Sequence, residues 1–195
     1  MKCYYTVKME HSEETLIKLA HMQYDLFCLR NYIARNLLSV CVILLGAYFF
    51  SQVWGILLMA YGVYLMTSVY SAANHTAKKT ANAIRSSGLG FPASQYMFEA
   101  RQLRILYRPG SADEEELEPV SYDRILKLGE DTGYFYLFAT DSGGYMIPKA
   151  ELEGRVDEFR RFLEERTGKP IFRSRSPLQR LRSWIKAREN EPMHL

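Results

Sequence analysis

The stretch NLLSVCVILLGAYFFSQVWGILLMAYGVYLMTSVY, residues 36–70, decides how this chain is built. No Asp, Glu, Lys or Arg occurs between Arg35 and Lys78, although the mean hydropathy of the whole chain, −0.21, is typical of a soluble protein. A membrane-spanning helix needs about 20 mostly apolar residues. The second apolar run has this length, and the first reaches it if Arg35 extends towards the lipid headgroups. The sequence therefore predicts two spans.

Only Ser51 and Gln52 interrupt the apolar stretch, which predicts a tight antiparallel hairpin over residues 36–73. A buried helical hairpin in a soluble core is the alternative. It is disfavoured because helices of soluble proteins usually keep a polar stripe, which neither run has. Small residues let membrane helices approach closely. The hairpin offers four of them: Gly46, Ala47, Ala60 and Gly62.

The flanking charges predict the orientation of the hairpin. Arg30 and Arg35 precede it, Lys78 and Lys79 follow it, and the connecting loop carries no charge. Because basic flanks stay on the cytoplasmic side, both termini should be cytosolic. More than thirty mostly hydrophilic residues precede the first run, so we expect no signal peptide. The three cysteines follow no pairing pattern and are expected to be free thiols.

The remaining sequence predicts an α+β fold. A strand at 4–9 precedes a helix that starts at Ser12, and a second helical segment continues from the hairpin to Ser87. Strand patterns then follow at 95–100, 103–108, 120–128, 134–140 and 145–148, with an acidic loop at 110–119 and a glycine-rich turn at 141–144. A helix from Glu151 to Gly168 closes the domain. The expected result is a small antiparallel sheet or partly open barrel, with the helical hairpin inserted after its first strand.

The segment VSYDRILKLGEDTGYFYLFATDSGGYMIPKAELEGRVDEFRRFLEE, residues 120–165, resembles the C-terminal domain of the YcxB-like family of bacterial membrane proteins. The resemblance is carried by Tyr122, Asp123 and Ile125, by the acidic turn before YFYLF, and by Ile147-Pro148-Lys149. Ala150 and Glu151 depart from it. The resemblance implies a pleckstrin-homology-like cytosolic domain in a bacterial cytoplasmic membrane protein, and it implies no established activity.

Charge divides the chain into opposed blocks. Residues 74–108 carry a net charge of +5, residues 109–168 carry −8, and residues 169–195 carry +5. Anionic lipids attract basic segments by roughly 1 kcal/mol per Lys or Arg. The acidic run 113–118 is either a solvated loop or a docking site for the chain's own basic tail or a basic partner.

These patterns divide the chain into five parts. They are a cytosolic strand and helix (1–35), the transmembrane hairpin (36–73), a juxtamembrane helix and loop (74–92), the YcxB-like β domain with its closing helix (93–168) and a basic tail (169–195). The tail predicts an amphipathic helix of the kind that lies in a membrane interface. Its expected lipid contacts are Arg180, Arg182, Trp184 and Lys186. The alternative is that the tail packs on its own domain or stays unstructured.

The sequence contains no motif of a known catalytic site. GxSxG, HExxH, GxxxxGK[ST] and paired CxxC are all missing. His75 lies near Lys78 and Lys79 at the cytosolic end of the second run, where the three could contact a lipid phosphate. Cys3, His11, His21 and Cys28 lack zinc-ligand spacing. We therefore expect no metal, no cofactor and no enzymatic activity.

The leading hypothesis is a membrane-anchored interaction or regulatory module that binds a protein partner or lipid headgroups. Its expected interaction surface comprises Tyr134, Tyr136, Tyr145 and Lys149. Two alternatives remain open: a membrane enzyme acting on a lipid through His75, and an accessory subunit of a transporter that makes contact through the hairpin. A homo-oligomer is also open. Nucleic-acid binding is disfavoured because the acidic domain would repel phosphates.

Overall fold

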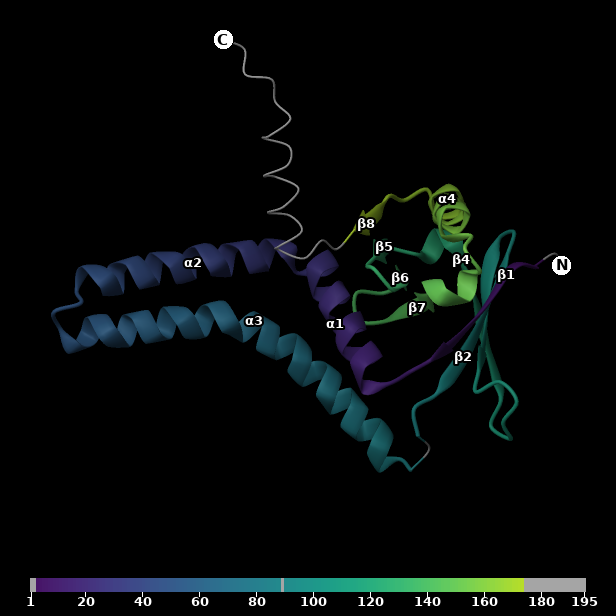
Figure 1. Cartoon of the computed structure of the whole chain (residues 1–195), viewed down its shortest axis with the longest axis horizontal. Helices are drawn as coiled ribbons and strands as arrows, with labels where there is room; N and C mark the ends of the chain where they lie inside the picture. The colour runs from purple at the N-terminus through teal and green to yellow at the C-terminus, as the bar shows by residue number, and fades with distance from the viewer. Residues whose placement is uncertain (1–2, 89, 174–195) are drawn as a thin grey trace, which may run out of the picture.

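The structure is a computed structural model that describes residues 3–88 and 90–173. It is an α+β fold in which an arm of two long helices extends away from two small β-sheets (Figure 1). The elements in chain order are β1 (Cys3–Glu10), α1 (Glu13–Phe27), α2 (Leu29–Tyr48), α3 (Val53–Ser86), β2 (Ala93–Glu99), β3 (Gln102–Tyr107), β4 (Glu115–Ser121), the 3₁₀ turn η1 (Tyr122–Arg124), β5 (Lys127–Glu130), β6 (Tyr134–Phe138), β7 (Gly144–Pro148), the 3₁₀ turn η2 (Lys149–Leu152), α4 (Val156–Thr167) and β8 (Ile171–Arg173).

The described strands form two four-stranded sheets, in the orders β1-β2-β3-β4 and β7-β6-β5-β8. All neighbouring strands are antiparallel except β5 and β8, which pair in parallel. Helix α4 joins the sheets through Phe159, whose buried ring packs against Phe98 of β2 and Phe135 of β6 at centroid distances of 4.9 and 5.3 Å. The aromatic core thus lies between both sheets and α4.

Several local predictions are confirmed. Ser12 caps α1, and its side chain and that of Thr15 form a reciprocal capping box. The predicted continuation of the second apolar run into a long helix is correct, because α3 extends to Ser86. Gly168 ends α4 in the left-handed conformation with φ 66°, which glycine adopts without steric cost.

The strand predictions need three corrections. The acidic loop is shorter than expected, since Glu115–Ser121 form β4 at the edge of the first sheet. The expected strand 120–128 is broken by η1, which turns the chain from one sheet into the other. Residues 171–173, assigned to the tail, form β8 and extend the β domain beyond residue 168. The polar β4 and the three-residue β8 have little strand signal of their own and become strands because a neighbouring strand pairs with them.

Helix α1 lies between the helical arm and the second sheet (Figure 1). On one side, Ala20 packs with Ala73 and Ala77 of α3, and Arg85 pairs with Glu13 at 2.7 Å. On the other side, α1 lies so close to β5 that a Cβ atom at Gly129 would come within 2.7 Å of the Met22 sulfur. The arm is therefore packed onto the β domain through α1.

Helices α2 and α3 form the expected hairpin, and glycines mediate their closest contacts. A Cβ atom at Gly46 would lie 2.7 Å from the main-chain oxygen of Gly55. The buried Ser39 hydroxyl donates a 2.6 Å hydrogen bond to the main-chain oxygen of Gly62. Ala47 and Ala60, also predicted at the contact, are exposed. Helix α2 is not continuous with α1, because the helical conformation is interrupted at Cys28.

In the part of the chain that the structure describes, no helix taken alone has the length and apolar composition to cross a membrane. Two segments of α3, Val53–Ser68 and Ala73–Ser86, meet at a 51° bend and together have the length and composition of a span. The apolar part of α2, Ile33–Tyr48, is shorter. The expected transmembrane hairpin is thus present as a helical hairpin, and its place in a membrane stays a prediction.

Replacing Gly46 with leucine should force the two helices apart. Overpacking of this kind costs about 1–3 kcal/mol, and two of the three nearest atoms at Gly46 are main-chain atoms of Gly55 and Met59, which cannot rotate aside as a side chain can. Thermal loss of the helical circular dichroism of the detergent-solubilised chain should shift to lower temperature. Ala47→Leu is the matched control, because Ala47 is exposed. Equal melting of the two variants would contradict the close contact.

Candidate functional site

The most highly connected polar group in the β domain is the carboxylate of Glu130, at the end of β5. Its side chain is only 7% exposed. Lys149 donates a 2.7 Å hydrogen bond to Oε1, and Arg160 binds both oxygens, through Nη2 at 2.6 Å and Nε at 2.9 Å. Arg173 of β8 lies 3.6 Å from Oε2. One carboxylate thus connects β5, η2, α4 and β8.

The cations determine the ionisation of this carboxylate. Burial alone would raise the pKa of Glu130, but the hydrogen bonds and charges of Arg160 and Lys149 outweigh it and lower the pKa to about 2. The same contacts raise the pKa of Arg160. The Glu130 carboxylate is therefore ionised at neutral pH, which suits a structural ion pair.

The neighbouring Asp131 organises the turn between β5 and β6. Its Oδ1 accepts hydrogen bonds from the main-chain nitrogens of Gly133 and Tyr134, at 2.8 and 2.7 Å. Its Oδ2 accepts a 2.6 Å hydrogen bond from the Tyr136 hydroxyl. Burial and the adjacent Asp131 carboxylate both raise the pKa of Tyr136. Lys149 also donates to the main-chain oxygen of Asp131. The acidic turn and Lys149 therefore form one unit.

The expected interaction surface does not exist as one exposed patch. Tyr136 is fully buried, so the prediction is wrong for that residue. Lys149 retains 15% exposure and is bound to Glu130. Tyr134 is half-buried beneath Lys18 of α1, whose Nζ lies 5.2 Å from the ring centroid, and Tyr145 is half-buried with its ring 6.1 Å from that of Tyr96. The two half-buried tyrosines lie at different places and form no shared site.

Sequence reasoning missed Glu130 and Arg160. Arg160 could have been noticed, because it lies on the same helical face as Val156 and Leu163, where an apolar residue is expected. A cation at such a position needs a buried acidic partner. Glu130 gave no comparable signal, since its burial depends on β8, which the sequence did not predict.

His75 lies on α3 in an open groove of about 690 Å³ lined mainly by hydroxyl-bearing residues. The other lining residues are Tyr64, Thr67, Ser68, Ser71 and Thr76. Arg35 of α2 reaches Ser68 with a 2.5 Å hydrogen bond, so a cation lies at the edge of this groove. Lys78 and Lys79 are exposed further along α3 and do not line it. The lining includes no carboxylate that could orient His75 as a general base.

The acidic run 113–118 is partly neutralised by the chain's own arginines. Glu116 pairs with Arg104 at 2.6 Å, and Asp113 lies 3.6 Å from Arg108. Glu114 accepts a 2.6 Å hydrogen bond from the main-chain nitrogen of Gly110. These contacts fit the interpretation as a solvated, locally paired segment.

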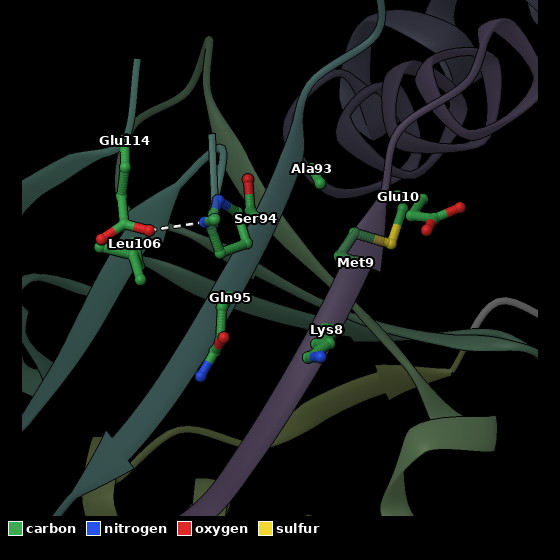
Figure 2. Close-up of a pocket in the computed structure, with 10 residues that line it drawn as sticks. Lys8, Met9, Glu10, Ala93, Ser94, Gln95, Leu106 and Glu114 are labelled. Carbon is green, nitrogen blue, oxygen red and sulfur yellow. Dashed lines mark hydrogen bonds between the residues drawn. The ribbon is translucent and has the colours of Figure 1, made fainter. Parts of the chain in front are cut away.

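A shallow pocket of about 470 Å³ lies beside Glu114, at the ends of β1, β2 and β3 (Figure 2). Figure 2 shows Lys8 of β1 beside Gln95 of β2, its partner in the strand register, with the Glu10 carboxylate nearby. The charged residues of the lining are one lysine and two glutamates, and this mixture favours no particular class of ligand.

Two further predictions concern metal binding and the basic tail. Among residues 3–88 and 90–173, no group of three His, Cys, Asp or Glu side chains could hold a metal ion. The tail residues Arg180, Arg182, Trp184 and Lys186 lie outside the described residues.

Residues 111–163 match the family model described as YcxB-like protein. This chain contains a YcxB-like domain. The match agrees with the resemblance inferred from Tyr122, Asp123 and Lys149, and it extends from the loop before β4 to Leu163 of α4. Glu130, Lys149 and Arg160 all lie inside the YcxB-like domain, whereas Arg173 lies outside it. Comparisons with curated proteins and with solved structures found no match.

Glu130→Gln should destabilise the β domain by about 3 kcal/mol, because it leaves Lys149 and Arg160 without their charged partner in a mostly buried place. Urea unfolding of the full chain in nonionic detergent, followed by near-ultraviolet circular dichroism, measures this. Asp157→Asn is the control: Asp157 also pairs with Arg160 but is 79% exposed, so its loss should cost below about 1 kcal/mol.

The difference between Glu130→Gln and the unchanged chain should depend on pH. Because the pKa of Glu130 is lower in the folded chain, its stabilisation is complete above about pH 4.5 and is lost as the pH falls towards 2. The two unfolding curves should therefore converge on acidification. A difference that stays constant from neutral pH to pH 2 would show that the charge of Glu130 is not what stabilises the domain.

Proposed function

We propose that this chain is a membrane-anchored interaction module whose YcxB-like domain lies at the cytosolic face of a bacterial cytoplasmic membrane. The hairpin of α2 and α3 spans the membrane, and both termini are cytosolic. The β domain, with a pleckstrin-homology-like arrangement of two sheets closed by α4, binds lipid headgroups or a protein partner.

The observation that carries the proposal is the apolar surface of the helical arm. Large side chains project outwards along both helices: Leu44 is 65% exposed, Trp54 73% and Tyr48 81%. Soluble monomeric proteins rarely expose so much contiguous apolar surface, and where it occurs it marks a contact with a membrane or with another protein. The β domain buries most of its apolar residues, and among the exposed large apolar side chains of the described residues all but Tyr4 and Leu126 lie in the arm.

The charges beside the arm support the orientation. Lys78, Lys79 and Arg85 are exposed on the part of α3 that follows the apolar stretch. Arg35 of α2 reaches Ser68, the last residue of the first apolar segment of α3, before the bend that leads to these basic residues. Tyr48 and Trp54, near the opposite end of the hairpin, are residues that favour a membrane interface. Basic residues at one end and aromatic residues at the other fit a hairpin inserted from the cytosolic side.

An accessory subunit of a transporter is the second candidate, and the same observation favours it. Other helices in a membrane, instead of lipid, would cover the exposed apolar side chains of the hairpin. A lipid-modifying enzyme has less support, because the groove around His75 offers hydroxyl groups but no carboxylate beside the imidazole.

The natural cysteines test the membrane arrangement. Cys3 is exposed on β1 and Cys41 is exposed on α2, so each can report from one part of the fold once the other two cysteines are replaced by serine. A membrane-impermeant maleimide should label Cys3 in inverted membrane vesicles but not in intact spheroplasts. Cys41 should remain unlabelled in both until detergent is added, because lipid shields it.

Two results would contradict the proposal. Labelling of Cys41 in intact membranes would place the hairpin in water, and release of the chain by alkaline carbonate would show that it is not embedded. Cys28, half-buried at the junction of α1 and α2, should label in inverted vesicles more slowly than Cys3 and serves as the internal reference.

A further inference from the structure

A small pocket lies where the β domain meets the base of the helical arm. Its volume is about 330 Å³, and its lining includes Leu26, Leu126, Lys127, Lys169 and Phe172. Leu26 belongs to the last turn of α1, three residues before α2 begins. The pocket thus combines two ammonium groups with an apolar wall at the entrance to the hairpin.

The fold brings the two lysines together through the parallel pairing of β5 and β8. Leu128 pairs with Ile171 in the strand register, and because the two strands are parallel, their N-terminal ends lie side by side. Lys127 is the first residue of β5, and Lys169 stands two residues before β8. If these strands were antiparallel, the two lysines would lie at opposite ends of the strand pair.

The ammonium groups of both lysines donate hydrogen bonds to main-chain oxygens. Lys127 donates a 2.5 Å hydrogen bond to the oxygen of Leu26 and lies 4.5 Å from the Phe27 ring centroid. Lys169 donates to the oxygen of Ile125. Among the described residues, neither has a carboxylate within salt-bridge distance, whereas Lys149 and Arg160 in the same domain do. Each ammonium group has three N–H donors, so donors remain for an anion.

The apolar part of the pocket is open to its surroundings. Leu126 is 48% exposed, although Leu128 of the same strand region and Phe135 and Leu137 of β6 are fully buried. Phe172 is half-buried on the other side. An exposed leucine beside two lysines suits a ligand with a negative head and an apolar body.

We propose that this pocket binds the phosphate headgroup of an anionic membrane lipid, with Lys127 and Lys169 on the phosphate and Leu126 and Phe172 on the glycerol and the first methylene groups. The proposal rests on the membrane arrangement proposed above, which brings the start of α2, and the pocket with it, to the level of the headgroups. Basic pockets at the cytosolic ends of membrane helices are suited to lipids of this kind.

The charge of the chain argues against its own tail as the occupant. Residues 174–195, which follow β8, carry five basic and two acidic side chains, a net charge of +3, so this segment would be repelled by Lys127 and Lys169. The acidic run 113–118 is engaged with Arg104 and Arg108. An anion from outside the chain is the better complement.

Native mass spectrometry of the full chain in nonionic detergent tests the proposal with phosphatidylglycerol and phosphatidylcholine as probes. One phosphatidylglycerol should be retained per chain in preference to phosphatidylcholine. Lys127→Gln combined with Lys169→Gln should lower its apparent affinity about tenfold or more. Arg101→Gln combined with Arg161→Gln is the matched control: it removes the same charge from exposed positions of the β domain that do not line the pocket, and it should have a much smaller effect.

Two further variants separate binding from folding. Lys127 also caps α1, so Lys169→Gln alone and Leu126→Gln, both with an unchanged melting temperature, should each weaken phosphatidylglycerol binding.

Equal losses in the two double variants would mean diffuse electrostatic attraction and would overturn the proposal. Displacement of the lipid by soluble glycerol phosphate at millimolar concentration would assign the pocket to free phosphate instead. Retention of the lipid in a chain without residues 174–195 excludes the tail as its binding site; loss overturns the assignment.

The labelling of Cys41 distinguishes failure of the lipid pocket from failure of the membrane arrangement. If Cys41 is shielded by the membrane but the lysine variants bind phosphatidylglycerol normally, only the lipid pocket is wrong. If Cys41 is labelled in intact membranes, the membrane arrangement itself fails.

Discussion

The ion cluster around Glu130 is the interaction on which the arrangement of the β domain depends. A nearly buried carboxylate is stable only because Lys149 and Arg160 compensate its desolvation. Those partners come from η2 and α4, and Arg173 extends the cluster to β8. The cluster thus fixes how the closing helix and the last strand sit on β5. The parallel pairing of β5 and β8, which creates the lysine pocket, lies beside this cluster, with Arg173 opposite Glu130 in the strand register.

Helix α1 has the corresponding role outside the β domain. Its alanine face packs on α3, its opposite side lies against Gly129 of β5, and Lys127 caps its C-terminal end. The β domain is therefore held against the arm at several points along α1, and no long linker separates them. This packing sets the orientation of the β domain relative to the arm, which suits recognition of a ligand held in a membrane surface.

The sequence predicted the elements whose patterns are local. The apolar runs, the cap at Ser12 and the glycine at the end of α4 each depend on residues close in the chain, and each is found where expected. The polar strand β4 and the three-residue strand β8 were missed because their stability comes from pairing with β3 and β5. Lys149 was selected as a surface residue for the same reason: its partner Glu130 is nineteen positions away, and only the fold brings them together.

The position of the hairpin between β1 and β2 means that the chain enters and leaves the arm through two strands of one sheet. These strands are hydrogen-bonded neighbours, although about eighty residues of sequence separate their partners Glu10 and Ala93. A single proteolytic cut within the arm would therefore not release the β domain, since the other strand would still hold it. During synthesis, β1 emerges first and must wait for β2 until the whole arm has been made. Maturation of this sheet is thus a late event that reports completion of the hairpin.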